Sequence, residues 1–400
     1  MANRVRITPR PNWQEKVEEI GFDWHTVDHV PYWDESAYWQ FTSEEVDTLE
    51  AATNEGYQMI LDAIGHVIES KQLPLFGYDD ETIKLIEDSW EKSDDLPHLY
   101  GRFDFAFDGV QPKILEFNGD TPTSLFEASV VQWYWLQELF PDSDQFNTIH
   151  EKLLAHLQTI DFRRRAQVHG NEWDRQMHVT CVTPHIEDQG TVSYIEMVAE
   201  EAGVPVKFVP LTDIGVKEES YDGVAQDSYF VDSEGKRIST IFKLVPWEWL
   251  LEDPFGDKLG EEVLAGRIDV IEPAWKMVAA NKRLLVTLWE LYPYHPLLLP
   301  THTTADSFAG KSYVRKPVWG REGQNVTIYK NDGAIEHAED GNYNDNLFVY
   351  QEKTDLLKAD DNYAVIGSWV INGESAGIGI RESKHAITNN VGRFVPHKFG

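Results

Sequence analysis

The most constraining feature of the sequence is a pair of alternating stretches within LYGRFDFAFDGVQPKILEFNGDTPTS, residues 99–124. Successive side chains of a strand point to opposite faces, so each stretch has an apolar face and a polar face. The apolar positions are Phe103, Phe105, Phe107, Leu115 and Phe117, and the polar positions are Arg102, Asp104, Glu116 and Asn118. Asp108-Gly109 between the stretches is typical of a hairpin turn. We therefore expect an antiparallel hairpin.

The register of this hairpin has a chemical consequence. A three-residue loop would place Asp104 opposite Glu116 and Arg102 opposite Asn118. Like charges directly across a ladder are destabilising, so the two carboxylates need a cation. Carboxylate and amide oxygens suit Mg²⁺. The alternative is the ordinary solvated face of a half-exposed antiparallel sheet, and the spacing alone leaves both interpretations open.

The segment after the second strand favours a ligand site. GDTPTS leads into SLFEASVVQWYWLQELF, which has a helical pattern. Thr123 or Ser124 is a suitable N-cap, with Glu127 available for a capping box. Because a helix N-terminus attracts negative charge, an anion or a carboxylate can be held beside the hairpin.

Composition excludes several classes of function. A length of 400 residues with 42% hydrophobic content suits two or three domains. The formal net charge of −33 argues against nucleic acid and against anionic membranes as partners. No apolar run is long enough for a membrane span, and MANRVRITPRPNWQEK lacks the core of a signal peptide. Cys181 is the single cysteine, which excludes disulfides and a thiolate zinc site. We expect a cytoplasmic protein.

The pattern along the chain predicts four segments. They are an aromatic N-terminal arm (1–40), a helical part with the hairpin (41–170), an α/β part (171–270) and a strand-rich part (271–400). Apolar residues recur at helical spacing in four stretches, which are 42–70, 80–92, 125–140 and 146–166.

The third segment reads as a small parallel α/β unit. HVTCVTP, IEDQGTVSYIEMVAEEAG and VPVKFVPL follow one another as strand, helix and strand. Ligands gather at the carboxyl ends of such strands, which here carry His185, Glu187, Asp188 and Thr191. An acidic loop that merely caps a helix is the alternative. Residues 221–245 are predicted to form a hairpin.

The fourth segment has the parts of a nucleotide site, although neither GxxxxGK[ST] nor GxGxxG after a strand occurs. Lys282 is predicted within a helix and Lys316 on a strand, followed by a turn with Gly320 and Gly323. Backbone N–H groups of such a turn, two lysines and a metal held by carboxylates can together hold phosphates. Taken by itself, a lysine on a strand such as Lys316 is more often an exposed surface residue than a phosphate ligand.

Together these segments resemble the synthetase part of the glutathionylspermidine synthase family, which are ATP-grasp acid–amine ligases. YGRFDF, EFNGDTPTS, HIEDQGT, ANKRLL, VRKPVWGREGQNV, VYQE, GIGIRES and RFVPH stand in the family's order over roughly residues 13–397. The resemblance implies a mixed α/β (α+β) chain with a circularly permuted ATP-grasp fold, because the metal residues precede the nucleotide lysines. Residues 41–170 and 271–400 would be its two parts. Residues 171–270 would be an inserted, preATP-grasp-like substrate domain.

The resemblance also implies roles for particular residues. Asp104, Glu116 and Asn118 would hold two Mg²⁺ ions, and Arg102 would contact the reacting carboxylate and the transferred phosphate. The remaining assignments are Lys282 and Lys316 on the ATP phosphates, the turn with Gly320, Gly323 and Gln324 over them, Gln351 and Glu352 beside the adenine, Thr121 and Thr123 on the acid substrate, and Arg381 in a mobile loop that closes over an acyl phosphate.

The implied reaction is amide formation. ATP phosphorylates a carboxylate, and an amine displaces phosphate from the acyl phosphate. The expected substrates are a small carboxylate, such as glutathione or a peptide, and an amine, such as a polyamine. Since the amidase domain of bifunctional members has no counterpart in this sequence, we do not expect hydrolysis of the product.

Two alternatives remain at this point. One is an ATP-binding relative without catalysis, although all the implied site residues are retained. The other is a glycosidase that uses Asp104 and Glu116, which would leave Lys282 and Lys316 unexplained.

Overall fold

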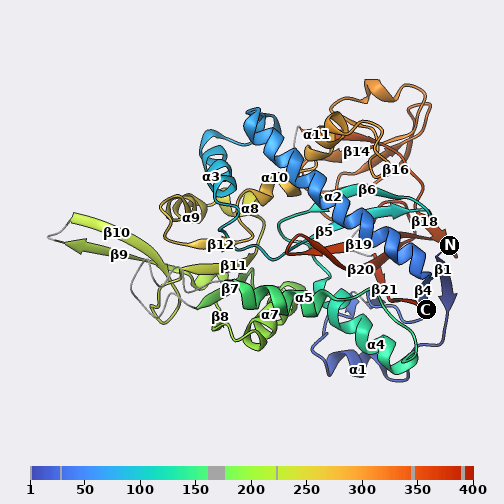
Figure 1. Cartoon of the computed structure of the whole chain (residues 1–400), viewed down its shortest axis with the longest axis horizontal. Coiled ribbons are helices and arrows are strands. Elements are labelled where there is room, and N and C mark those ends of the chain that lie inside the picture. Colours follow the sequence, from blue (N-terminus) through green and yellow to red (C-terminus); the bar gives the residue numbers. More distant parts are fainter. Residues whose placement is uncertain (1, 28, 161–175, 222–223, 344–346, 389–391) are drawn as a thin grey trace.

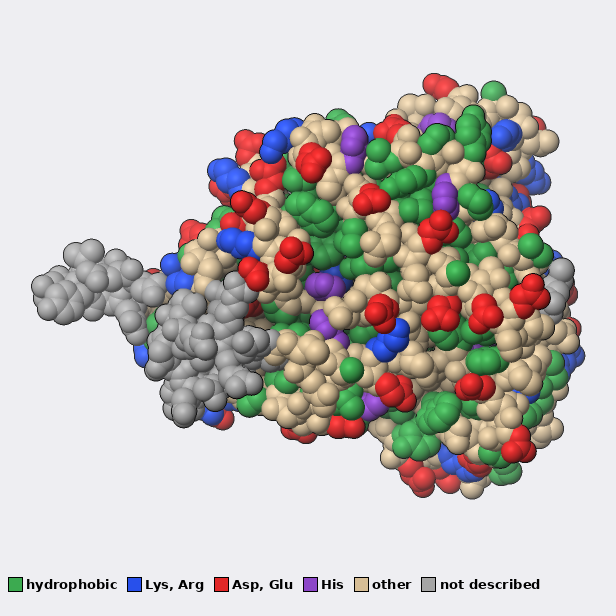
Figure 2. Space-filling view, in the orientation of Figure 1, with side chains coloured by type: hydrophobic (Ala, Val, Ile, Leu, Met, Phe, Trp, Pro, Cys, Tyr) green, Lys and Arg blue, Asp and Glu red, His purple; other side chains and the backbone are tan. Residues whose placement is uncertain are grey.

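The structure of the chain, a computed structural model, describes residues 2–27, 29–160, 176–221, 224–343, 347–388 and 392–400. These residues form a mixed α/β protein in which helices surround several sheets (Figure 1). Figure 2 shows acidic side chains spread over the visible face, in keeping with the net charge of −33. Among the described residues, no helix combines the length and the apolar character needed to cross a membrane.

The largest sheet is antiparallel and contains the predicted hairpin. Its strands are β21 (Arg393–Val395), β20 (Glu374–Ser383), β19 (Asn362–Ile371), β5 (Tyr100–Phe107) and β6 (Pro112–Asn118) in this order, with β18 (Leu357–Ala359) paired to β19. A five-stranded antiparallel sheet has the order β13 (Thr301–His302), β17 (Phe348–Glu352), β14 (Tyr313–Pro317), β15 (Thr327–Tyr329) and β16 (Ile335–Ala338).

Two smaller sheets complete the body. A parallel sheet has the order β12 (Asp269–Ile271), β11 (Thr240–Leu244), β7 (Met177–Cys181) and β8 (Val206–Phe208). A three-stranded sheet contains β1 (Asn3–Arg6), β4 (Ala37–Phe41) and β22 (His397–Phe399), so strands from near both ends of the chain flank β4. In the described part of the chain, two further pairs of strands form separate two-stranded sheets, which are β2 (Thr26–Val27) with β3 (Val30–Pro31) and β9 (Gly215–Tyr221) with β10 (Val224–Val231).

The helices lie around these sheets. They are α1 (Trp13–Glu18), α2 (Ser43–Glu69), η1 (Leu73–Phe76), α3 (Asp80–Glu91), the π-helix η2 (Glu127–Val131), α4 (Gln132–Leu139), α5 (Ile149–Thr159), α7 (Ile186–Glu201), η4 (Leu211–Asp213), α8 (Trp247–Leu251), α9 (Pro254–Leu264), α10 (Lys276–Ala280), α11 (Leu284–Leu291) and η5 (Ala305–Phe308). The helices expected at 42–70 and 80–92 are confirmed as α2 and α3. The helix expected at 146–166 is α5, and its predicted continuation beyond 160 lies outside the described residues.

Helix α2 begins at Ser43 because neighbouring side chains accept hydrogen bonds from the free N–H groups of its first turn. Thr42 Oγ1 accepts from the Glu45 backbone N–H at 3.2 Å, and Glu45 Oε2 accepts from the Thr42 N–H at 3.0 Å, which is a capping box. The apolar face of α2 packs in one cluster with Phe103 and Phe105. Since alternate side chains of β5 point to opposite faces, Arg102 and Asp104 face away from α2.

The register of the hairpin is confirmed, with one local difference. Asp104 pairs with Glu116, and Arg102 pairs with Asn118. The turn, however, has four residues (108–111) because Asp108 Oδ1 accepts from two backbone N–H groups within it. Leu115 is the extra residue of a bulge that restores the register. Leu115 therefore lines the cavity described below, and its predicted place on the apolar face is wrong.

The capping box predicted for the next helix does not form. Ser124 has a positive φ of 67°, and neither it nor Thr123 caps the helix by a side-chain hydrogen bond. Glu127 is buried, and its Oε1 accepts from Trp24 Nε1 at 2.9 Å. The helix expected at 125–140 consists of η2 followed by α4.

The parallel unit is confirmed, and the hairpin predicted at 221–245 forms only around its turn. Strands β7 and β8 pair in parallel and α7 connects them. Val231 at the end of β10 bridges Arg237, and the Ile238 N–H donates to the carbonyl oxygen of Phe230 at 2.8 Å. The rest of β10 pairs with β9 instead of with residues 240–244, and this β9–β10 hairpin projects from the body (Figure 1). The residues expected to form its second strand are β11, which lies between β12 and β7. Both faces of a parallel sheet are buried, so a short apolar strand such as β11 is stable in its interior. Strand β11 therefore pairs with β12 and β7 and not with β10, which precedes it in the sequence.

A buried ion pair joins the parallel sheet to the segment after β6. Lys243 Nζ lies 2.6 Å from Asp120 Oδ1, and Asp120 Oδ2 accepts from the Trp247 backbone N–H at 2.9 Å. Both side chains are at most 2% exposed. Breaking a buried pair leaves the other charge without compensation, which costs more than loss of a surface pair.

We expect Asp120→Asn to lower the free energy of unfolding by roughly 3–5 kcal/mol, because Lys243 stays buried without its counter-charge. Chemical denaturation measures this. The control is Asp88→Asn, which breaks the partly exposed Asp88–Lys92 pair of α3 and should cost below about 0.5 kcal/mol. Similar losses in the two variants would contradict the structural role of the Asp120–Lys243 pair.

Candidate active site

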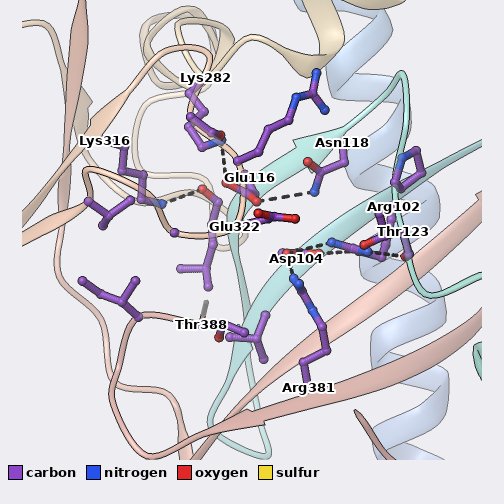
Figure 3. A pocket seen from close by; sticks show the side chains of 18 of the residues that line it. Arg102, Asp104, Glu116, Asn118, Thr123, Lys282, Lys316, Glu322, Arg381 and Thr388 are labelled. Carbon is purple, nitrogen blue, oxygen red and sulfur yellow. Dashed lines mark hydrogen bonds and ion pairs between the residues drawn. The ribbon is translucent and has the colours of Figure 1, made fainter. Parts of the chain in front are cut away.

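A cavity of about 530 Å³ lies where the two large antiparallel sheets meet the parallel sheet. This volume is typical of a small-molecule site. Its lining includes most of the residues singled out in the sequence, which are Arg102, Asp104, Glu116, Asn118, Thr121, Thr123, His185, Asp188, Lys282, Lys316, Gly320, Gly323, Gln351, Glu352 and Arg381 (Figure 3). The structure therefore brings together residues from the second, third and fourth predicted segments.

Asp104 is held between two guanidinium groups. Arg102 Nε donates to Asp104 Oδ1 at 2.7 Å, and Arg381 Nη2 donates to Oδ2 at 2.6 Å (Figure 3). Arg102 Nη1 also donates to the carbonyl oxygen of Thr123 at 2.6 Å. Two arginine side chains therefore provide the positive charge that was predicted to balance Asp104.

Arg381 is not in a loop, as was expected, but on β20. Its Cα pairs with Val365 on β19 and with Phe394 on β21, so the backbone is fixed on both sides. The loop follows β20, and its residues Ala386–Thr388 line the cavity.

Glu116 is compensated by lysines. Its Oε2 lies 2.9 Å from Lys282 Nζ, which also donates to the carbonyl oxygen of Gly320. Burial works against ionisation of Glu116, but Lys282 and Lys316 outweigh it and lower its pKa to about 2. Glu116 is therefore a carboxylate at neutral pH.

Lys282 lies in the turn between α10 and α11, so its predicted place within a helix is wrong. Its backbone N–H donates to the carbonyl oxygen of Val318 at 2.9 Å. The side chain of Asn281 accepts from the Arg283 N–H at 2.9 Å within this turn. This interruption turns the ammonium group toward Glu116.

Lys316 is on β14 as predicted, and it is buried instead of being a surface residue. Its Nζ donates to Gln351 Oε1 at 2.7 Å and to the carbonyl oxygen of Leu115 at 2.9 Å. Burial lowers its pKa to about 8, with a further lowering by Lys282 and an opposing effect of Glu116. At neutral pH the ammonium group remains charged.

The donor set on the hairpin fits a magnesium ion only in part. Asp104 and Glu116 pair across the two strands, and Asn118 lies beside Glu116 with its Nδ2 3.4 Å from Oε1. The described part of the chain has no cluster of three or more histidine, cysteine or acidic residues suited to a metal. Mg²⁺ is commonly held by one or two carboxylates together with water and substrate phosphates, so these oxygens are sufficient protein ligands. They would have to exchange their present arginine and lysine partners for the ion.

The glycine turn covers one side of the cavity. Gly323 has a φ of 71°, and a Cβ at this position would lie 2.6 Å from the carbonyl oxygen of Thr388. Gln324, in contrast, is absent from the lining, and its Oε1 accepts from the Asn342 N–H at 3.2 Å. The expected contact of Gln324 with a ligand is therefore not supported.

Sequence reasoning missed two residues of this turn. Arg321 Nη1 donates to Thr121 Oγ1 at 3.0 Å, and its Nη2 lies 2.5 Å from Glu248 Oε1 on α8. Glu322 also lines the cavity. The sequence GREGQN indicated the turn. It did not indicate the partners of Arg321, which come from two distant segments of the chain.

The carboxyl ends of the parallel strands contribute an acidic side. His185 and Asp188 line the cavity, whereas Thr191 is buried outside the lining. Burial raises the pKa of Asp188, and the nearby carboxylate of Glu322 raises it further, while His185 opposes both effects. The cavity thus has a cationic side at the hairpin and an acidic side at α7.

Comparisons with known proteins give matches that cover nearly the whole chain. The sequence model of the family described as glutathionylspermidine synthase preATP-grasp matches residues 4–400. A Haemophilus influenzae protein with the provisional name acid–amine ligase is 37% identical over 403 residues, covering 98% of this chain and 97% of that protein. The trypanothione synthetase of Crithidia fasciculata is 28% identical over 83% of this chain, and the bifunctional glutathionylspermidine synthetase/amidase of Escherichia coli is 24% identical over 88%.

This chain spans only 52% and 57%, respectively, of the length of the latter two proteins. A solved structure also matches. A glutathione synthetase-like effector from Globodera pallida has a TM-score of 0.55 at 10% identity, covering 94% of this chain and 92% of its own. That likeness shows a glutathione synthetase-like fold.

The lowered pKa of Lys316 predicts that the affinity of the cavity for anions depends on pH. We expect the affinity for inorganic tripolyphosphate to fall by up to about tenfold per pH unit above pH 8, because Lys316 loses its proton there. Below that pH the ammonium group is charged and the affinity should be steady. Calorimetric titration at a series of pH values measures this. Lys316→Arg keeps its charge and should abolish the decline, so a decline that persists in this variant would exclude Lys316 as its source.

Proposed function

The chain belongs to the glutathionylspermidine synthase preATP-grasp family, and we propose that it is an ATP-dependent, ADP-forming ligase that joins a carboxylate to an amine. The observation that carries this proposal is the charge arrangement of the cavity. Four cationic side chains surround two carboxylates on one side, and acidic side chains lie on the other. Phosphate transfer to a carboxylate needs positioning and neutralisation of charge, and no nucleophilic side chain.

Lys282 and Lys316 are proposed to neutralise the phosphates of ATP. Both ammonium groups are buried beside Glu116 at the cavity wall, and the turn with Gly320 and Gly323 lies next to them. Gln351 positions Lys316 by accepting its hydrogen bond of 2.7 Å, and Glu352 follows Gln351 on the same strand. Gln351 and Glu352 are proposed to lie near the adenine. Gln324 is left out of this site.

The reacting carboxylate is proposed to lie against Arg102, with Thr121 and Thr123 beside it. A guanidinium group binds carboxylate or phosphate in a bidentate manner, which fixes the orientation of the acid. Arg381, on β20 on the other side of β19, is proposed to bind the transferred phosphate. Asp104, Glu116 and Asn118 would hold Mg²⁺, with two ions expected. When bound, Mg²⁺ would neutralise phosphate charge between the two substrates.

The acidic side is proposed to receive the amine. Asp188 and Glu322 both line the cavity there, and an ammonium group would be attracted to them. The names of the relatives point to glutathione and polyamines as substrates to examine first. The proposed domain organisation places an arm at 1–40, the two parts of a circularly permuted ATP-grasp domain at 41–170 and 271–400, and a preATP-grasp-like domain at 171–270. The boundary at 170 lies outside the described residues.

The test is ADP release with Mg-ATP against a matrix of carboxylates and amines. Glutathione, short peptides, amino acids, spermidine and putrescine should be included. We expect ADP only when one acid and one amine are both present, with the amide as product in mass spectrometry. ATP binding without ADP release for any pair would favour an ATP-binding relative that has lost catalysis.

With an active pair, we expect Glu116→Gln to lower kcat by about 10²–10³-fold, because a charged group aimed at the metal and phosphates is lost. The dependence on Mg²⁺ should move to higher concentration. Glu374→Gln is the matched control, since Glu374 is exposed and pairs with Lys152 at the surface. A kcat within twofold of the unchanged protein in Glu116→Gln would exclude Glu116 from the metal site.

A further inference from the structure

The N-terminal arm, residues 1–40, reaches the segment behind the active site through Tyr32. Its hydroxyl oxygen lies 3.0 Å from Ser124 Oγ. Ser124 is 4% exposed and is the last residue of the turn GDTPTS, which follows β6 and carries Thr121 and Thr123 at the cavity wall. None of the roles proposed above uses Tyr32 or Ser124. Their contact nevertheless joins the start of the chain to the site.

Ser124 has an unusual backbone conformation. Its φ of 67° lies in the left-handed region, which residues with a side chain rarely adopt. Such a conformation persists only where the surrounding structure holds it. Ser124 is held by the Tyr32 hydroxyl at its side chain, and by the Ala128 N–H, which donates to its carbonyl oxygen at 3.2 Å. The contact with Tyr32 is therefore one of the constraints that keep the turn in this shape.

The shape of the turn decides where the carbonyl group of Thr123 points. This carbonyl belongs to the peptide unit before Ser124, so a change in φ of Ser124 would rotate it. Its oxygen accepts from Arg102 Nη1 at 2.6 Å. The other contacts of the guanidinium group are with Asp104 on the same strand, from Nε at 2.7 Å and from Nη2 at 3.2 Å. The Thr123 carbonyl therefore anchors the guanidinium group from outside β5.

The rest of the Arg102 side chain is also closely confined. A Cβ at Gly367 on β19 would lie 2.9 Å from Arg102 Cδ, so the aliphatic stem passes close to the neighbouring strand. A guanidinium group has five N–H bonds, and the contacts with Asp104 and Thr123 use three of them. Two N–H bonds remain for a substrate, and their direction depends on both anchors.

The backbone of the arm also supports the second arginine. The Phe394 N–H donates to the carbonyl oxygen of Tyr32 at 2.7 Å, and the Asp34 N–H donates to that of Phe394 at 2.9 Å. Phe394 on β21 pairs with Arg381 on β20. Between these two hydrogen bonds, the fully buried ring of Trp33 stacks on the ring of Phe394 with centroids 5.7 Å apart. The arm thus contacts the supports of both arginines of the site.

We propose that Tyr32 is a positioning residue of the active site, which holds Ser124 in its left-handed conformation and thereby keeps the Thr123 carbonyl on Arg102. Arg102 would contact the substrate, and Tyr32 would act only through it. Because a small displacement of an orienting group costs much of the rate, loss of the Tyr32 hydroxyl slows the reaction without weakening ATP binding. This inference rests on the proposed ligase function, in which Arg102 orients the reacting carboxylate.

The first experiment needs no substrate. Protein labelled with nitrogen-15 at arginine Nε is studied by NMR, and the Arg102 signal is identified by its absence in Arg102→Lys. We expect Tyr32→Phe to shift this signal and to speed exchange of the Nε–H with water by at least about tenfold, because the guanidinium group loses an anchor. An unchanged signal and exchange rate overturn the proposal.

The matched control is Tyr38→Phe, which removes the same atom from another tyrosine of the arm. Tyr38 packs against Trp135 and Phe140, and not against the turn that holds Arg102. We expect its Arg102 signal to be that of the unchanged protein. An equal change in the two variants would trace the effect to general loosening of the arm and overturn the specific role of Tyr32.

The second experiment measures turnover with the acid–amine pair found in the substrate matrix. Tyr32→Phe and Ser124→Ala should each lower kcat by about 10–100-fold, with KM for ATP within about twofold of the unchanged protein. Since both changes break the same contact, the double variant should be within about twofold of the slower single variant. Additive losses would show that the two hydroxyls act independently and overturn the proposal.

Ser124→Gly separates backbone positioning from a purely structural hydrogen bond. Glycine adopts the left-handed conformation without strain, so the turn keeps its shape more readily without the hydroxyl contact. In the Tyr32→Phe background we expect Ser124→Gly to give a kcat at least about fivefold higher than Ser124→Ala, which retains the strain. A glycine variant as slow as the alanine variant overturns the proposal.

The outcomes distinguish this inference from the proposed function. If the unchanged protein releases no ADP with any pair, but Tyr32→Phe alters the Arg102 signal and Tyr38→Phe does not, the ligase function falls and the hold of the arm on Arg102 stands. If Tyr32→Phe and Tyr38→Phe turn over equally fast, the positioning role is overturned and the ligase function stands.

Discussion

The neutralisation of two carboxylates on adjacent strands is the interaction on which the rest of the site depends. Asp104 and Glu116 lie opposite each other on β5 and β6, a pairing that is unfavourable by itself. Arg102 compensates Asp104 from its own strand, but Arg381 and Lys282 come from β20 and from the turn before α11. Part of the charge compensation of the hairpin therefore comes from the later part of the chain. The same contacts place cations where phosphate and carboxylate groups would bind.

The local order of the sheet was predictable from the sequence. Alternation of Phe103 and Phe105 with Arg102 and Asp104 is a property of neighbouring residues, and it predicted both the strand and the face that carries charge. Capping of α2 by Thr42 was equally local. The family was also identified correctly, because its motifs occur in order along the chain.

The differences arose where a distant segment decides the local structure. Glu127 has the spacing of a capping residue, yet the indole of Trp24, 103 residues earlier, holds it in the interior. The resemblance implied that Arg381 lies in a loop, yet β19 and β21 pair with its strand on both sides. Lys282 lies in an apolar helical pattern that is interrupted by a backbone hydrogen bond to Val318. Such contacts leave no periodic signal in the sequence.

The order of the strands in the large sheet has a consequence for biosynthesis. Strand β5 pairs with β19, whose residues are synthesised long after it, and β20 with Arg381 follows later still. A nascent chain that has reached only the parallel sheet carries Asp104 and Glu116 without Arg381, Lys282 or Lys316. The hairpin can then reach its final electrostatic balance only near the end of translation. A chain that ended before β19 would have an acidic central hairpin in which β5 is paired on one side only.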